Sequence, residues 1–150
     1  MYYLMKSEPS EYSIDDLAKD TTSSWFGVRN YQARNFMRDM KVWDEILFYH
    51  SSCDIVGVAG LARVAKVAHA DESQFDPKSD YYEPKSTKDK YLWECVDVGF
   101  VEKFKKVVTI SDIRANEKLA SMRILQKGNR LSVTPVSKEE FEEIVKMSKS

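Results

Sequence analysis

Four short segments of the chain combine aromatic rings with side chains that form directional hydrogen bonds. They cover residues 6–9, 25–30, 48–51 and 130–135. A flat heteroaromatic ligand needs an aromatic face on which to stack and polar groups that recognise its edge. The segments therefore predict a pocket for a ring like a nucleobase. Its stacking face would come from Trp25 or Tyr49, and its edge contacts from Ser7, Glu8, Asn30 and Ser132.

Two arginines of this region, Arg29 and Arg34, are suited to binding phosphate groups. A guanidinium can hold a phosphate through two parallel hydrogen bonds. For Arg29 the alternative is an ion pair with Asp20 or with a helix end. An exposed pair of that kind stabilises a fold by only about 0–1 kcal/mol.

Structural roles compete with binding roles at several of these positions. Trp25 stands in a polar loop beside Gly27, where the alternative to a ligand contact is a lid over the core. Tyr49 lies in an apolar strand, where core packing is an equal alternative. Asn30 can cap the helix that follows, and one side chain cannot easily cap a helix and read a base at once. Ser132 can be an ordinary strand-edge residue.

The sequence carries no recognisable catalytic motif. It has no GxxxxGK phosphate loop, no GxSxG and no HExxH. His50 could act with Ser51 or Cys53 as a nucleophilic pair, but no orienting acid or oxyanion hole is identifiable, so a local hydrogen bond is the stronger interpretation. A zinc site would need His50, Cys53, His69 and Cys95 to converge. We therefore expect no catalysis, no cofactor and no metal.

The charge of the chain nearly cancels, because 23 Lys and Arg face 24 Asp and Glu and give a net charge of -1. This balance argues against an electrostatic grip on nucleic acid by the whole surface. Basic residues nevertheless gather locally. Residues 25–41 hold four basic side chains and one acidic one, and residues 119–136 hold Arg123, Lys127 and Arg130 with no acid. A local basic face is therefore possible, although solvated helix faces would explain the same counts.

The chain has the size and composition of a single domain of 150 residues. Its longest uncharged apolar run, Ile55–Ala62, is far shorter than the roughly 20 residues of a membrane-spanning helix. Two cysteines make a poor disulfide framework, and the chain starts without a signal-peptide pattern. We expect a reduced, monomeric protein in the cytoplasm, or in the nucleus if the source is eukaryotic, with no membrane partner.

Local patterns predict short strands interleaved with short helices. Helices are indicated after Ser13, after Asn30, over residues 117–125 and after Ser137. Residues 21–29 and 70–90 are expected to be loops, and Ser51–Asp54 a hairpin connection. Strands are predicted over residues 2–6, 42–50, 55–67, 91–104, 107–110 and 131–133.

These elements do not alternate as βαβ units, which favours an antiparallel, barrel-like sheet with helices at its ends. Gly57 and Gly60 lie inside the strand predicted over residues 55–67. Glycines inside a strand are typical of a bulge or a tight bend. The expected fold class is therefore α+β.

The sequence resembles the EVE domain family. The matching strings occupy residues 6–9, 27–35, 48–51, 56–59, 75–77 and 131–133, and GVRNYQARN at residues 27–35 is the most specific. The resemblance implies a PUA-like fold, a mixed or antiparallel β-barrel flanked by short helices, related to ASCH and YTH domains. It also implies a non-catalytic domain that binds RNA or DNA and holds a modified base, such as a methylated or hydroxymethylated cytosine.

With this resemblance, the predicted site comprises twelve residues. The base would contact Ser7, Glu8, Trp25, Val28, Asn30, Tyr49, Ser51 and Ser132. Phosphates would contact Lys6, Arg29, Arg34 and Arg130. The alternatives are an enzyme that acts on a nucleobase with Glu8 or His50 as acid or base, and a protein-interaction module that uses the loop at residues 70–90.

One position departs from the family pattern and bears on the backbone. Trp43 stands before Asp44 where the family usually has glycine. A tryptophan does not easily adopt a positive φ. We therefore expect a different turn geometry at this point. The orientation of Trp93, toward the pocket or toward the core, does not follow from the sequence.

Overall fold

A computed structural model describes all residues, 1–150, and shows one mixed six-stranded sheet in the order β2-β5-β4-β3-β1-β6. Strands β1 and β3 pair in parallel, and every other neighbouring pair is antiparallel. The strands are β1 (Tyr2–Ser7), β2 (Thr22–Ser24), β3 (Glu45–His50), β4 (Gly57–Ala70), β5 (Glu94–Thr109) and β6 (Val133–Val136). The α+β class is confirmed, but the sheet is open, because its outer strands β2 and β6 do not pair with each other.

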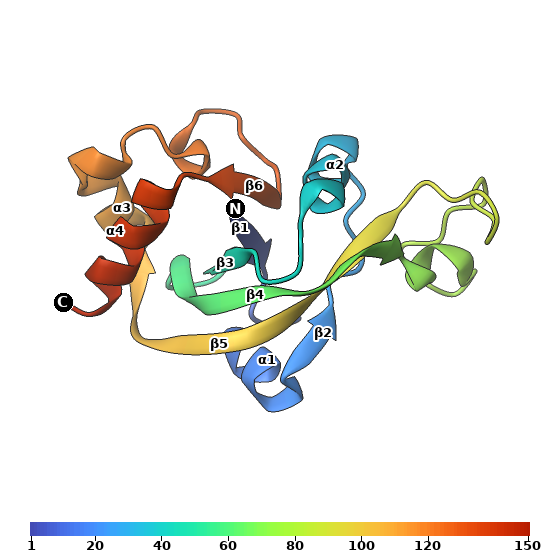
Figure 1. The fold of residues 1–150 in the computed structure, drawn as a ribbon, viewed down its shortest axis with the longest axis horizontal. Coiled ribbons are helices and arrows are strands. Elements are labelled where there is room, and N and C mark those ends of the chain that lie inside the picture. The colour runs from blue at the N-terminus through green and yellow to red at the C-terminus, as the bar shows by residue number, and fades with distance from the viewer.

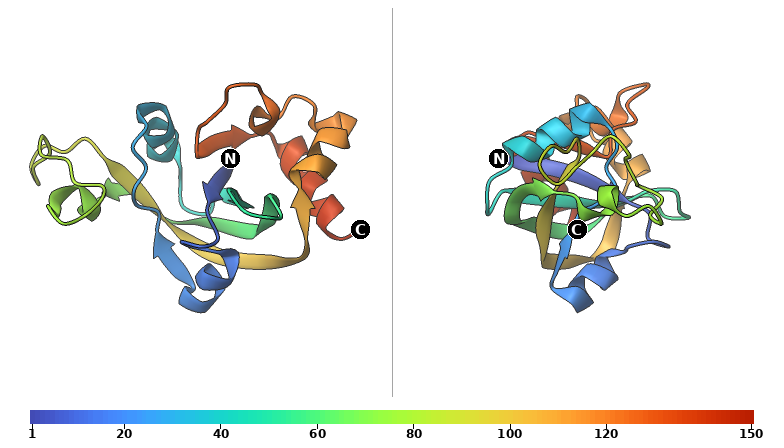
Figure 2. Two further views of the ribbon diagram at one scale, coloured as in Figure 1. Left: turned by 180° about the vertical axis from the view of Figure 1, so that it is seen from behind. Right: turned by 90° about the vertical axis from the view of Figure 1, so that its right-hand side faces the viewer.

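Four α-helices flank the sheet: α1 (Ile14–Asp20), α2 (Tyr31–Asp39), α3 (Ile110–Ala115) and α4 (Lys138–Ser148). Figure 1 shows α3 and α4 at one end of the molecule, while the segment between β4 and β5 extends at the other end. The same segment projects away from the sheet when the molecule is seen from behind (Figure 2). None of the helices is long and apolar enough to cross a membrane.

The side chains of the central strands alternate between two hydrophobic clusters. Met5 and Phe48 belong to the first cluster, together with residues of α1 and α2. Leu47 and Tyr49 belong to the second cluster, together with residues of β5, α3 and α4. Because successive strand residues point to opposite faces, burial on both faces makes these strands continuously apolar.

The starts of α1, α2 and α4 were predicted because capping is local, whereas α3, which Thr109 caps, was not predicted. Ser13 and Ser137 each open a helix through a capping box, and Asn30 Oδ1 accepts a hydrogen bond from the Ala33 N–H at 2.9 Å. The predicted helix over residues 117–125 is wrong. That stretch forms two single 3₁₀ turns, at residues 117–119 and 123–125.

Three strand predictions also need correction. The two strands expected at residues 91–104 and 107–110 are one continuous strand, β5. The expected loop at residues 21–29 contains β2, which pairs with β5. The last strand continues through Pro135 instead of ending before it, which is possible because β6 is the outermost strand and need not donate a hydrogen bond there.

The turn before β3 adopts the left-handed backbone conformation although it carries a tryptophan. Trp43 has φ +80° and a highly exposed side chain. Such a backbone costs an L-residue about 1–2 kcal/mol. The Arg63 guanidinium lies 4.3 Å from the centroid of the indole ring, a cation–π contact worth about 0.5–1 kcal/mol at an exposed site. This contact offsets part of the backbone cost.

Gly60 permits the close approach of β4 to β5 and α1 at the expected bulge. The pairing register shifts at this point with both neighbouring strands. In the pairing with β3 the shift falls between Phe48 and Tyr49, and in the pairing with β5 it falls between Val58 and Gly60. A Cβ atom at Gly60 would lie 2.3 Å from the Glu102 carbonyl oxygen and 2.8 Å from Ile14 Cγ1. The first of these neighbours is backbone and cannot rotate away.

We predict that Gly60→Ala lowers the free energy of unfolding by about 1–3 kcal/mol, because the added methyl group overpacks the contact of β4 with β5 and α1. Urea unfolding monitored by circular dichroism measures the change. Gly99→Ala is the matched control, since a Cβ at Gly99 meets no atom closer than 3.8 Å. Equal stability of the two variants would contradict this account of Gly60.

Candidate nucleic-acid interface

Nine of the twelve predicted site residues line one pocket of about 500 Å³. These nine are Lys6, Ser7, Glu8, Trp25, Val28, Arg29, Ser51, Arg130 and Ser132. The pocket also takes in residues that were not predicted as contacts, namely Glu11, Tyr12, Ser23, Ser24, Phe26, Gly27 and Tyr81. Three of the predicted residues, Asn30, Arg34 and Tyr49, lie outside it.

The sheet brings these segments together because the end of β3 and the segment before β6 lie on either side of the end of β1. The parallel register sets Ser7 opposite His50, and the Ser51 N–H donates to the Ser7 carbonyl at 2.9 Å. On the other side of β1, the Lys6 N–H donates to the Ser132 carbonyl at 2.8 Å. Segments that are more than 40 residues apart in sequence thus meet at one edge.

One wall of the pocket is formed by the turn that follows β1. The Glu8 carbonyl accepts hydrogen bonds from the N–H groups of Glu11 and Tyr12, both at 2.9 Å. The Ser7 hydroxyl donates to the Tyr12 carbonyl at 2.6 Å. Because its proton is used in that bond, the Ser7 oxygen is left to act as an acceptor. The exposed carboxylate of Glu8 adds a second acceptor on this wall.

Trp25 forms a pocket wall and is also a core residue. Its side chain is only 9% exposed and packs edge-on against Phe48, with ring centroids 5.4 Å apart at 82°. Its backbone N–H donates to the Val96 carbonyl at 2.8 Å. Trp25 therefore packs in the core and also lines the pocket, and its contact with a ligand stays a prediction.

Two further rings form the rim. Phe26 is 58% exposed and meets Tyr81 edge-on, with centroids 6.0 Å apart. Tyr81 packs on the backbone of Gly27, where a Cβ atom would come within 2.8 Å of the tyrosine ring, and Gly27 itself has φ +87°. Sequence reasoning missed Tyr81, because the only signal was the length of the 70–90 loop that carries it.

A buried ion pair fastens this rim to the rest of the protein. The Asp71 carboxylate is fully buried and accepts hydrogen bonds from the Gly27 N–H at 2.8 Å, from Arg29 at 3.0 Å and from Ser73. Burial alone would raise the pKa of Asp71. The hydrogen bonds from Ser73 and Gly27 and the Arg29 charge outweigh burial and hold the pKa below its usual value.

Arg29 borders the pocket, but its donors are committed to the protein. Its guanidinium donates to Asp71, to the Val28 carbonyl, to Ser73 and twice to the Tyr81 carbonyl. An arginine has five N–H donors. All five are used within the protein, so Arg29 positions the segment that carries Tyr81, and its predicted contact with a phosphate would require it to give up one of these bonds.

Arg34 is likewise held by the protein outside the pocket. It donates to the Leu92 carbonyl at 2.7 Å and lies 4.8 Å from the centroid of the Tyr31 ring. Tyr31 in turn stacks on Trp93, with centroids 4.9 Å apart. This stack orients the nearly buried Trp93 ring toward α2, and the indole is not part of the pocket lining.

Tyr49 and Asn30 are excluded from the pocket for different reasons. Tyr49 follows Phe48 by one residue and so faces the second hydrophobic cluster, where burial raises the pKa of its hydroxyl. Asn30 uses Oδ1 to cap α2 and lines a neighbouring groove. The positions of the two residues thus fit their structural alternatives, which were core packing for Tyr49 and helix capping for Asn30.

His50 makes the structural hydrogen bond that was favoured over catalysis. Its Nε2 accepts from the Ile14 N–H at 3.1 Å, and burial lowers the pKa of the imidazole. The other histidine, His69, lies 2.8 Å from Asp97 and 3.9 Å from the Cys95 sulfur. Burial raises the pKa of the Cys95 thiol to about 12, which keeps it protonated and unreactive. No group of three or more His, Cys, Asp or Glu side chains is arranged to hold a metal ion.

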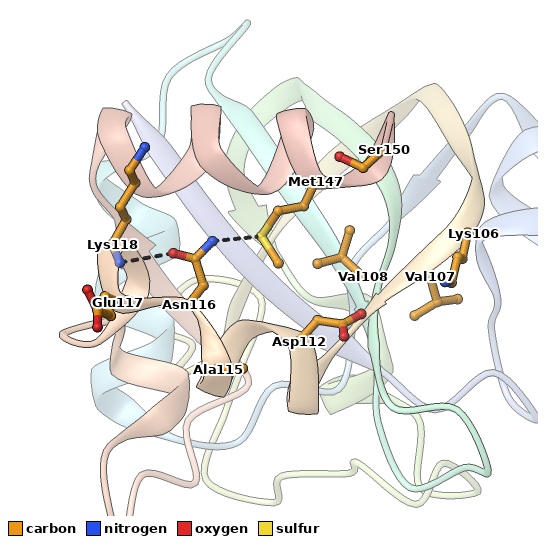
Figure 3. Close-up of a pocket in the computed structure, with 10 residues that line it drawn as sticks. All are labelled: Lys106, Val107, Val108, Asp112, Ala115, Asn116, Glu117, Lys118, Met147 and Ser150. Carbon is orange, nitrogen blue, oxygen red and sulfur yellow. Dashed lines mark hydrogen bonds between the residues drawn. The ribbon is translucent and has the colours of Figure 1, made fainter.

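A larger cavity of about 600 Å³ lies between the end of β5, α3 and α4 (Figure 3). It contains no aromatic ring and none of the predicted site residues. The Asn116 side chain there accepts from the Lys118 N–H at 2.9 Å and donates to Glu143 at 2.7 Å. Its amide is thus used in joining the turn at residue 116 to α4, and the cavity offers no stacking face.

The comparisons with known proteins point to one family. The family model described as EVE domain matches residues 1–147. Thymocyte nuclear protein 1 of Mus musculus is 38% identical over 168 residues, which cover 99% of this chain and 74% of the mouse protein.

Solved structures agree with this match. A crystal structure of a protein from Pseudomonas putida has a TM-score of 0.96 and 47% identity, and covers 99% of both chains. Human THYN1 protein, crystallised in complex with 5-methylcytosine-containing DNA, has a TM-score of 0.93 and 36% identity over 99% of this chain and 98% of that one. An ASCH protein from Zymomonas mobilis, at 10% identity and a TM-score of 0.55, shares the fold alone.

We predict that Asp71→Asn destabilises the protein by about 3 kcal/mol at pH 7, because it leaves Arg29 partly buried without its charge partner. The pKa of Asp71 is lowered in the folded state, so its carboxylate stabilises the fold above pH 4 and loses this effect as the pH falls through the folded pKa. The difference from wild type should therefore shrink on acidification. Urea unfolding between pH 3 and pH 7 measures it.

The control for this series is Asp54→Asn, which removes an exposed carboxylate that makes no ion pair. We expect its stability to follow wild type at every pH. If Asp71→Asn also followed wild type, the ion pair would contribute nothing to the fold.

Proposed function

Because this chain belongs to the EVE domain family, we propose that it binds nucleic acid and accommodates one base, a modified cytosine such as 5-methylcytosine, in the pocket beside Trp25. The relative crystallised with 5-methylcytosine-containing DNA supports this choice of ligand. A volume of about 500 Å³ falls in the range of small-molecule sites, about 300–1,000 Å³.

The observation that carries the proposal is the meeting of rings and acceptors at one strand edge. Trp25 forms an inner wall, Phe26 and Tyr81 form an outer rim, and Ser7 and Glu8 face the same space. The exocyclic amine of cytosine is a hydrogen-bond donor. The acceptors of Ser7 and Glu8 match that edge.

Binding requires the base to leave its stack, which costs a few kcal/mol. Stacking of a base on an aromatic side chain returns about 1–3 kcal/mol. The rest of the binding free energy must come from edge contacts and from phosphates held by basic side chains such as Lys6 and Arg130. The small net charge of the chain implies that such phosphate contacts are few.

The geometry supports binding rather than catalysis. An acid–base reaction at this pocket would use Glu8 or His50. The Nε2 of His50 is engaged by the Ile14 N–H, and His50 is not part of the pocket lining. Glu8 is exposed at the pocket wall, and no hydrogen bond fixes its carboxylate. We therefore propose that the base is held and released unchanged.

We predict a preference of about fourfold for DNA that carries 5-methylcytosine over the same DNA with cytosine. Burying one methyl group against apolar walls contributes about 0.8 kcal/mol. Fluorescence anisotropy with the two labelled DNAs measures the ratio of their dissociation constants. Equal affinities, or a preference for the unmodified DNA, would refute the proposal that the pocket recognises 5-methylcytosine.

We predict that Phe26→Ala weakens binding of the modified DNA by about 5- to 150-fold, the equivalent of one lost stacking contact. Phe26 is the suitable position, because it is exposed, whereas Trp25→Ala would remove a core ring and cost about 3–5 kcal/mol of stability. Trp43→Gly is the control, since it deletes another exposed aromatic ring at a positive φ. A similar effect of both variants would remove Phe26 from the site.

A further inference from the structure

A second groove adjoins the base pocket and shares Arg130 with it. It has a volume of about 410 Å³ and opens between the N-terminus of α2 and the loop before β6. Only one of its nine lining residues is hydrophobic, and none is acidic. The lining consists of Asn30, Gln32, Arg123, Gln126, Lys127, Gly128, Asn129, Arg130 and Leu131.

The three basic side chains of this groove form neither an ion pair nor a hydrogen bond within the protein. Arg123, Lys127 and Arg130 take part in none of the ion pairs, and their side chains form no hydrogen bond. Arg29 and Arg38 are by contrast bound to Asp71 and Glu94. The cations of the loop before β6 therefore keep their donors available for a ligand in the groove.

The loop that carries these cations is held in a fixed shape. The Asn129 side chain donates to the Arg123 carbonyl and accepts from the Leu131 N–H at 3.0 Å. The Asn129 N–H closes a turn on the Gln126 carbonyl at 3.1 Å. The Arg123 guanidinium lies 5.5 Å from the centroid of the Phe36 ring, which orients its plane without using its N–H groups.

The charged residues around the base pocket favour one path for a bound nucleic-acid strand. Glu8 and Glu11 line the wall after β1 and repel phosphates. Arg130 stands where the base pocket meets the second groove, and two more unpaired cations lie beyond it. A strand whose base enters the pocket thus finds attraction in only one of these two directions.

We propose that this groove, defined by Arg123, Lys127 and Arg130, binds the phosphodiester backbone next to the base held in the pocket. This inference rests on the proposed function and adds to it a separate surface that binds the phosphodiester backbone. Guanidinium and ammonium groups hold phosphate oxygens without reading sequence. The groove therefore supplies affinity, while the pocket supplies the choice of base.

The test compares two double variants that each remove two positive charges. Arg123→Gln/Lys127→Gln removes cations from the groove, and Lys105→Gln/Lys106→Gln removes exposed, unpaired lysines from β5 as a matched control. Affinity for 5-methylcytosine and cytosine DNA is measured by anisotropy between 50 and 200 mM salt (about a fourfold span). The groove variant should bind both DNAs more weakly, and its slope of log K against log salt should be less steep by about 2.

Each outcome bears on a different claim. An unchanged slope in the groove variant, or an equal change in the control, overturns the groove while leaving base recognition intact. If wild type binds the two DNAs equally well but the groove variant has the less steep salt slope, the proposed recognition of the modified base is refuted and the groove proposal is supported. If wild type binds neither DNA, both proposals are overturned. Thermal unfolding of the two double variants shows that they remain folded, since all four side chains are exposed.

Discussion

The mouth of the pocket depends on one buried carboxylate. Asp71 accepts hydrogen bonds from the Gly27 N–H, the Arg29 guanidinium and Ser73, and so joins the loop between β2 and α2 to the long segment between β4 and β5. A charge out of contact with water is tolerated only when it is paired and hydrogen-bonded, as it is here. Without this link nothing comparable would hold the Tyr81 ring against the backbone of Gly27.

The arginines of the protein divide into two groups by how their donors are used. Arg29 and Arg34 spend their donors on carbonyl and carboxylate oxygens that shape the loop. Arg123 and Arg130 keep theirs available at the surface. A chain with a net charge of -1 can thus present a local basic face, because no acidic residue lines the groove that holds Arg123 and Arg130.

Local sequence patterns were sufficient for the starts of three of the four α-helices and for most of the residues that line the pocket. The caps at Ser13 and Ser137 involve residues within one turn, and the family strings placed nine residues at the pocket. The errors occur where a distant partner decides. The ion pair of Arg29 joins residues 42 apart, and the burial of Tyr49 depends on which face β3 presents to which cluster. The open sheet was not predictable either, since edge pairing is a property of the whole fold.

The rim tyrosine belongs to a segment that contributes no strand to the sheet. Residues 76–93 connect β4 to β5 without joining the strand order, and Tyr81 reaches the pocket from there. Changes in the length or composition of this connection alter the opening of the pocket without disturbing either hydrophobic cluster. This layout separates the shape of the pocket mouth from the packing of the sheet.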